Sequence, residues 1–97
     1  MITMVARWHV KPGHVDDVIA ALNRMAPLVA AHEPDCQLYH ANRSLDDENL
    51  ILLYERYTDL DAITAHRETS YFREIVDGII FPLIERRERE LFDAVMG

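Results

Sequence analysis

A carboxylate, a phenol and an imidazole follow one another closely in the segment that runs from Glu55 through Tyr57 to His66. Glu55 and Tyr57 close an apolar stretch typical of a strand, and the next residues have the pattern of a helix that carries His66. An imidazole titrates near neutrality, so His66 could act on a small molecule as a base or as a hydrogen-bond donor. The sequence therefore predicts His66 as the catalytic residue.

Both His66 and Glu55 also admit a structural interpretation. His66 can pack between a helix and a sheet and bond to a backbone carbonyl or to Glu55. Glu55 shares its strand face with Leu53 and Tyr57, where an apolar side chain is expected, and a carboxylate at such a position needs a partner. A backbone amide or an arginine at the sheet or at a subunit interface would serve, and for Glu55 this structural role is favoured over catalysis.

Aromatic side chains spread along the chain could form a flat slot around His66, which is the shape that a polycyclic ligand requires. The candidates for binding a substrate are Trp8, Tyr39, Tyr54, Tyr57 and Phe72. Each of them could equally be an ordinary core residue. A closed, water-poor cavity of roughly 300 Å³ or more around His66 would favour small-molecule chemistry, whereas a filled interior would favour a binding or structural role.

The elements that position these residues follow from the period of the apolar side chains. The expected order is a strand at 2–10, a helix from 14 to about 32 with Pro27 inside it, strands at 36–43 and 50–57, a helix at 60–67 and a strand from about 86 to 95. Asp59 is the expected N-cap of the 60–67 helix, and Thr69 or Ser70 caps a further helical piece. The apolar positions of that piece are Tyr71, Phe72, Ile75, Val76 and Ile79.

This order predicts a single domain over residues 1–97 with an α+β, ferredoxin-like β-α-β-β-α-β fold, in which helices cover one face of an antiparallel sheet. The 50–57 strand is apolar on both of its faces: Leu50, Leu52 and Tyr54 lie on one, and Ile51, Leu53 and Tyr57 lie on the other. Helices cover only one face in this architecture, and a large exposed apolar face is uncommon on a monomer. We therefore expect a homodimer that closes two sheets into a barrel.

Composition narrows the class of partner. A formal charge of −7, without a sustained basic stripe, argues against nucleic acid, and no apolar run reaches the length that spans a bilayer. The lone Cys36 and an N-terminal segment without a basic start and a long apolar region favour the cytoplasm. Because no two histidines have the spacing of metal ligands, no metal site is expected.

Short motifs over nearly the whole chain resemble those of the antibiotic biosynthesis monooxygenase domain family, in particular its quinol monooxygenases. These motifs are Glu33-Pro34-Asp35-Cys36 with Tyr39, Leu52-Leu53-Tyr54-Glu55-Arg56-Tyr57 with Asp59, Ala62 and His66, and then Thr69 and Phe72. The chain departs from the family pattern at Asp35, where glycine is usual, and at Tyr57, where tryptophan is commoner.

The resemblance implies a dimeric α+β barrel that oxygenates a quinol, an anthrone or a related aromatic molecule with dioxygen and without metal, flavin or haem. Such chemistry is physically reasonable, because a deprotonated electron-rich substrate can itself pass an electron to dioxygen; the protein supplies a base, a stabiliser of negative charge and a dry pocket. Other members are isomerases or haem degraders, and Asn42 and Asn49 do not match the haem-degrading pattern. The alternatives are an isomerase of the same fold and a non-catalytic dimeric module that binds a small molecule or only assembles.

Overall fold

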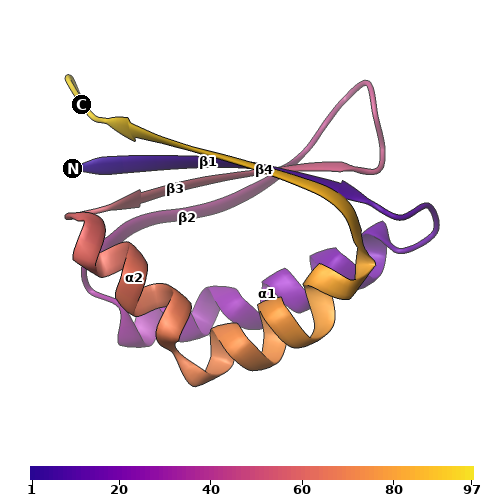
Figure 1. Ribbon diagram of the computed structural model, residues 1–97, viewed down its shortest axis with the longest axis horizontal. Helices are drawn as coiled ribbons and strands as arrows, with labels where there is room; N and C mark the ends of the chain where they lie inside the picture. The colour runs from indigo at the N-terminus through magenta and orange to yellow at the C-terminus, as the bar shows by residue number, and fades with distance from the viewer.

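An antiparallel four-stranded sheet carries every helix on one of its faces in the computed structural model, which describes residues 1–97 (Figure 1). In chain order the elements are β1 (Ile2–Val10), α1 (Val15–His32), β2 (Cys36–Arg43), β3 (Leu50–Tyr57), α2 (Leu60–Glu68), the π-helix η1 (Phe72–Ile80), the 3₁₀-helix η2 (Phe81–Leu83) and β4 (Ile84–Asp93). The strands lie in the order β2-β3-β1-β4. This arrangement confirms the predicted ferredoxin-like fold.

The pairing of β1 with β3 and β4 decides which side chains face the helices. Met4 lies opposite Glu55 on β3, while Ala6 lies opposite Arg89 and Trp8 opposite Arg87 on β4. Side chains of directly paired residues project to the same face of a sheet. These residues of three strands therefore share the face that the helices cover.

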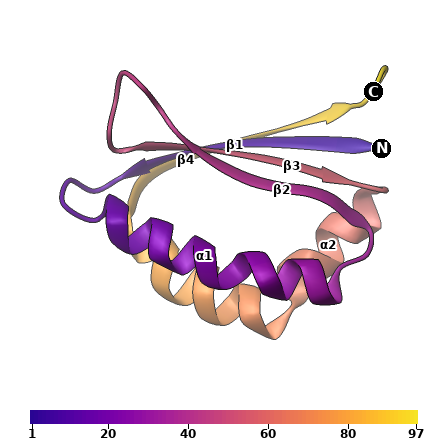
Figure 2. The ribbon, with the colours of Figure 1, turned by 180° about the vertical axis from the view of Figure 1, so that it is seen from behind.

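The strand β3 has one buried face and one partly exposed face, as its apolar pattern predicts. Ile51, Leu53, Glu55 and Tyr57 are buried, and the residues between them are only partly covered. Seen from behind in Figure 2, α1 and α2 again lie on the same side of the sheet. The face that carries Leu52 therefore has no covering element from its own chain.

The helix α1 packs closely and continues without interruption through Pro27. Its buried side chains recur at three- and four-residue spacing, which places them on a single stripe. These side chains are Val18, Ala21, Leu22, Met25 and Val29. Gly13, with φ +87°, adopts the left-handed conformation that glycine tolerates and turns the chain from β1 into α1.

The helical segment after α2 differs from its prediction. Asp59 caps α2 by accepting a hydrogen bond from the amide of Ala62 at 2.9 Å, as expected, and Thr69 Oγ1 accepts one from the amide of Phe72 at 3.2 Å. The next segment is a π-helix, whose bonds join residues five apart, so each turn holds more residues than an α-helical turn. Consequently Ile80 is fully buried, whereas Ile79, predicted on the apolar face, is 38% exposed.

The last strand, β4, begins two residues before its predicted start and lies at the edge of the sheet beside β1. Most of its side chains are exposed. The two ends of the chain lie side by side, because the amide of Ala94 donates to the carbonyl of Met1 at 3.0 Å. None of the helices combines the length and the apolar character needed to cross a membrane.

Candidate functional site

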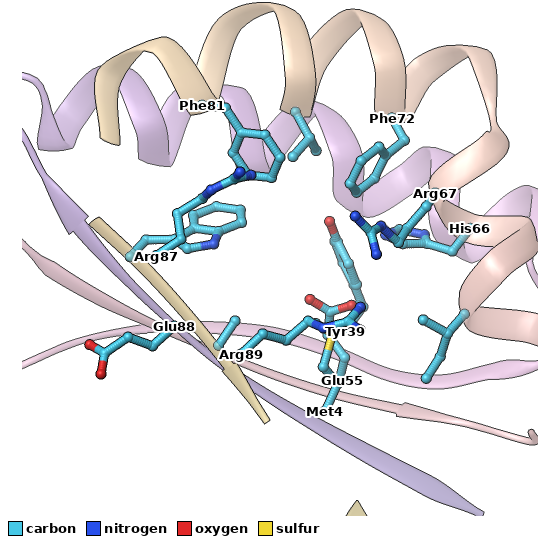
Figure 3. Close-up of a pocket in the computed structure, with 14 residues that line it drawn as sticks. Met4, Tyr39, Glu55, His66, Arg67, Phe72, Phe81, Arg87, Glu88 and Arg89 are labelled. Carbon is cyan, nitrogen blue, oxygen red and sulfur yellow. The ribbon is translucent and has the colours of Figure 1, made fainter. Parts of the chain in front are cut away.

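A cavity of about 280 Å³ lies between the sheet and the α2–η1 side of the helical layer (Figure 3). All four strands contribute to it, together with α2, η1 and η2, whereas α1 contributes no side chain. Its apolar wall includes Met4, Ala6, Trp8, Ile63, Val76 and Phe81. This volume lies just below the range of about 300–1,000 Å³ typical of small-molecule sites. The cavity is partly open to solvent, and exposed side chains of β4 form part of its rim.

His66 reaches the cavity from α2, and only 4% of its surface is exposed. Its Nδ1 lies 2.7 Å from Glu33 Oε1, and the hydroxyl of Tyr71 donates a hydrogen bond to Glu33 Oε2. The structural interpretation of His66 named a backbone carbonyl or Glu55 as its partner, and the observed partner is instead Glu33. Glu33 stands immediately after α1, so one carboxylate joins the end of α1 to α2 and to the start of η1.

The hydrogen bonds of Glu33 fix the orientation of the imidazole. A carboxylate can only accept hydrogen bonds, so Nδ1 of His66, 2.7 Å from Glu33 Oε1, is assigned as the nitrogen that carries the proton and donates it. The opposite nitrogen, Nε2, makes no hydrogen bond within the protein and is not sealed from solvent. In this tautomer Nε2 has a free lone pair and can accept a proton.

Aromatic rings surround the imidazole of His66. The ring centroids of Phe72, Tyr39 and Tyr57 lie 5.1, 5.5 and 5.7 Å from that of His66. Such distances are within the range of favourable aromatic contacts. These contacts, together with the bond to Glu33, hold the ring in a single position.

The predicted aromatic residues divide into three groups. Trp8, Tyr39 and Phe72 line the cavity. Tyr57 is fully buried behind it, where it contacts His66 and donates a hydrogen bond to Glu55. Tyr54 lies on the opposite face of the sheet, because neighbouring strand residues alternate between faces, so it cannot contribute to this cavity.

Glu55 lines the floor of the cavity and is only 3% exposed. Burial raises the pKa of its carboxyl group, while the hydroxyl of Tyr57 and the nearby positive groups oppose that shift. Burial, followed by the proximity of Glu55, also raises the pKa values of Tyr39 and Tyr57. Both phenols therefore stay protonated near neutral pH and can donate hydrogen bonds.

Sequence reasoning did not identify Glu33 or the arginines of the cavity as site residues. Arg67 follows His66 on α2, and Arg87 and Arg89 alternate along β4. For the β4 residues a signal was present, because residues two apart on a strand share a face. Glu33 gave no comparable signal, since its contact with His66 joins residues distant in the sequence.

Cys36 has the properties of a buried thiol. It is partly buried and lies near the carboxylates of Glu55 and Glu33. Burial, reinforced by those negative charges, raises the pKa of the thiol to about 12. The sulfur donates a hydrogen bond to the carbonyl of Leu38 at 3.3 Å. Cys36 is therefore protonated at neutral pH and is a poor nucleophile.

The family model described as antibiotic biosynthesis monooxygenase matches residues 1–78. The chain belongs to this family, and membership indicates a general monooxygenase-like function. The site described above lies mostly within the matched residues, whereas Phe81, Arg87 and Arg89 lie beyond them. No curated protein matches the sequence significantly.

Solved structures share the fold over almost the whole chain. A protein from Caulobacter crescentus, provisionally assigned to the antibiotic biosynthesis monooxygenases, is 29% identical, with a TM-score of 0.90 over 98% of this chain and 90% of its own. A Shewanella oneidensis protein is 25% identical, with a TM-score of 0.84 over 94% of this chain and 87% of its own. A Nitrosomonas europaea protein with the same provisional assignment is 23% identical, with a TM-score of 0.86 over 99% of this chain and 100% of its own.

Proposed function

We propose that the protein is a cofactor-independent monooxygenase that acts on an electron-rich quinol, anthrone or related aromatic molecule. The observation that carries the proposal is His66 itself: it lines an aromatic-walled cavity, and its Nδ1 is bonded to Glu33 while Nε2 is left without a protein partner. Membership in the monooxygenase family and the provisional assignment of the Caulobacter crescentus protein support the same class of reaction.

The proposed reaction begins when Nε2 of His66 removes a proton from the substrate. The imidazolium that forms is stabilised by Glu33, which accepts the Nδ1–H bond at 2.7 Å. The hydroxyl of Tyr39, which stays protonated, is the proposed donor to the developing negative charge on the substrate oxygen. Trp8 and Phe72 exclude water from the aromatic body of the substrate.

The remaining steps balance without a cofactor. For an anthrone, the carbanion passes one electron to dioxygen, and the two radicals combine into a peroxide at the same carbon. Loss of water from the protonated peroxide then leaves a ketone. One oxygen atom of dioxygen enters the product, and the other leaves as water together with the two hydrogens of the original methylene group.

The role of His66 is tested by oxygen uptake with anthrone or naphthohydroquinone as substrate. Replacing His66 by Ala should lower turnover at least about tenfold, since a positioned base contributes that much or more. The matched control is His14→Ala, because His14 is exposed just before α1 and does not line the cavity. Incorporation of one ¹⁸O atom from ¹⁸O₂ into the product identifies the reaction as monooxygenation.

Glu33→Gln separates orientation of the base from binding of the substrate. The amide introduced by this substitution could still meet His66 but would not stabilise its positive charge, so kcat should fall while KM changes little. Turnover by His66→Ala equal to that of the unchanged protein would reject His66 as the base. The absence of any oxygen uptake with these substrates would favour the non-catalytic binding module or the isomerase.

We also propose that the uncovered sheet face joins a second copy of the chain in a two-fold dimer. Partly exposed apolar side chains such as Val5, Leu38 and Leu52 lie on that face, and Arg56, on the same face of β3, has a buried Nε without a hydrogen-bond partner. Leu52→Asp should halve the mass measured by light scattering, whereas Ile79→Asp, on the helical side, should leave it unchanged. A monomeric unchanged protein would contradict this assembly.

A further inference from the structure

Three guanidinium groups line a cavity in a protein whose overall charge is strongly negative. Arg67 comes from α2, and Arg87 and Arg89 come from β4 (Figure 3). The chain as a whole has 17 acidic and only 10 basic residues. None of these three arginines forms an ion pair within the chain, although Arg24, Arg43 and Arg86 do. Positive charge is therefore concentrated at the cavity and left unpaired there.

The acidic residues that line the cavity do not cancel this charge. Glu88 points away from the cavity in Figure 3, where its carboxylate lies 2.6 Å from His9 Nε2 and forms an ion pair with Arg86 at 3.7 Å. Glu55 faces the cavity, but its carboxyl group is deeply buried and accepts a hydrogen bond from Tyr57. Burial raises the pKa of Glu55, which favours its neutral form, and Arg89 opposes that shift only in part.

Strand pairing and aromatic packing place the guanidinium groups. Arg87 and Arg89 lie opposite Trp8 and Ala6, so both project to the helix-covered face of the sheet. The guanidinium carbon of Arg87 lies 3.6 Å from the centre of the Phe81 ring. Phe81 in turn meets Trp8 edge-to-face at 5.8 Å. Arg87 is thus stacked on the aromatic wall, while Arg67 and Arg89 extend toward the cavity near Tyr39 and Glu55 (Figure 3).

We propose that the substrate carries a carboxylate on its planar aromatic body and that Arg67 and Arg89 bind this carboxylate, while Arg87 stacks beside the rings. A guanidinium fork matches the geometry of a carboxylate and stays charged at all relevant pH values. A volume of about 280 Å³ suits a bicyclic acid and excludes much larger anions such as nucleotides. The aromatic part of this assignment rests on the proposed function, whereas the charge preference rests on the arginines alone.

Calorimetric titration with a matched pair of non-oxidisable ligands tests the charge preference without turnover. The ligands are 2-naphthoic acid and 2-naphthamide, which share a ring system and differ in charge. The acid should bind at least about tenfold more tightly than the amide, because hydrogen bonds to charged groups are the stronger ones. The preference should shrink in high salt, which screens charges at an open site.

Arginine variants test whether Arg67 and Arg89 cause the preference for the acid over the amide. In the double variant Arg67→Gln and Arg89→Gln the acid and the amide should bind within about threefold of each other, and the affinity for the amide should be preserved. Arg73→Gln is the control, because Arg73 is exposed on η1 and does not line the cavity. Circular dichroism and thermal unfolding of each variant confirm that a loss of affinity does not reflect a loss of fold.

The outcomes separate this inference from the proposed function. Equal binding of acid and amide, failure of both to bind, or a preference that survives in the double variant would overturn the carboxylate site. Oxygen uptake with neutral anthrone tests the oxygenase activity independently of any carboxylate. A preference for the acid without oxygen uptake would support the carboxylate site and reject the oxygenase activity. Oxygen uptake without a preference for the acid would support the oxygenase activity and reject the carboxylate site.

Discussion

The two halves of the layer between helices and sheet are built in opposite ways. Under α1 the space is filled, with Val18 and Met25 fully buried and no cavity-lining residue contributed by that helix. Under α2 and η1 the same sheet faces a cavity of about 280 Å³ that holds His66 and Glu55. The difference indicates that the space under α1 is packed throughout, whereas the space under α2 and the start of η1 keeps room for a ligand.

The largest expected effect on stability comes from emptying the filled half. Met25→Ala should lower the free energy of unfolding by about 2–5 kcal/mol, because it leaves a cavity among side chains that cannot readily close around it. Urea unfolding measures this loss. Asn23→Ala, exposed on the same helix, is the control and should change stability by less than about 0.5 kcal/mol. A loss below about 1 kcal/mol for Met25→Ala would show that the α1 half is loosely packed.

Two buried alanines allow a direct comparison of the halves. Ala21 on α1 is 3% exposed and Ala6 on β1 is 4% exposed, but only Ala6 lines the cavity. Ala21→Leu should destabilise by about 1–3 kcal/mol through overpacking, whereas Ala6→Leu has space to occupy and should cost less than about 1 kcal/mol. Ala6→Leu should nevertheless weaken binding of 2-naphthoic acid. Equal losses of stability in the two variants would contradict the contrast between the halves.

The smallest effect expected is a change in how stability depends on pH. Burial raises the pKa of Glu55, so above the ordinary range of a glutamate the folded protein retains a proton that the unfolded chain has released. This contribution to the free energy of unfolding therefore falls as pH rises above the ordinary range of a glutamate. Glu55→Gln removes it, so the variant should gain stability relative to the unchanged protein as pH rises above about 4.3, the ordinary pKa of a glutamate. Unfolding curves at a series of pH values give the free energy of unfolding of both proteins. A variant that loses stability relative to the unchanged protein as pH rises would contradict the prediction.

Local pattern was sufficient for much of the fold. Each element buries only one of its faces, and that requirement sets the period of its apolar residues. In β1 the buried residues alternate, as at Met4, Ala6 and Trp8. In α1 they recur every three or four residues, as at Val18, Leu22 and Met25. The cap at Asp59 is also local, because its partner Ala62 is three residues away. These features depend on near neighbours in the sequence, and the structure confirms them.

The candidate site depended on information that local pattern does not contain. The pair of Glu33 and His66 forms only when the end of α1 meets α2, and the burial of Ile80 in place of Ile79 depends on the π-helical bonding of η1. His66, Trp8, Tyr39 and Phe72 line the cavity as proposed from the sequence, whereas Tyr54 faces the other way. The position of Tyr54 followed from strand alternation and was available in advance.

The place of β4 at the edge of the sheet has a consequence for how such proteins diverge. Its side chains at 87 and 89 reach the cavity while remaining exposed, so exchanging them disturbs little of the packed interior. Glu33 and His66, in contrast, connect three helical segments and tolerate little change. Changes along this one strand can therefore alter the preferred ligand while the pair of Glu33 and His66 and the framework stay fixed. A single scaffold of this kind is suited to give rise to a set of proteins that share one site and differ in the ligands they bind.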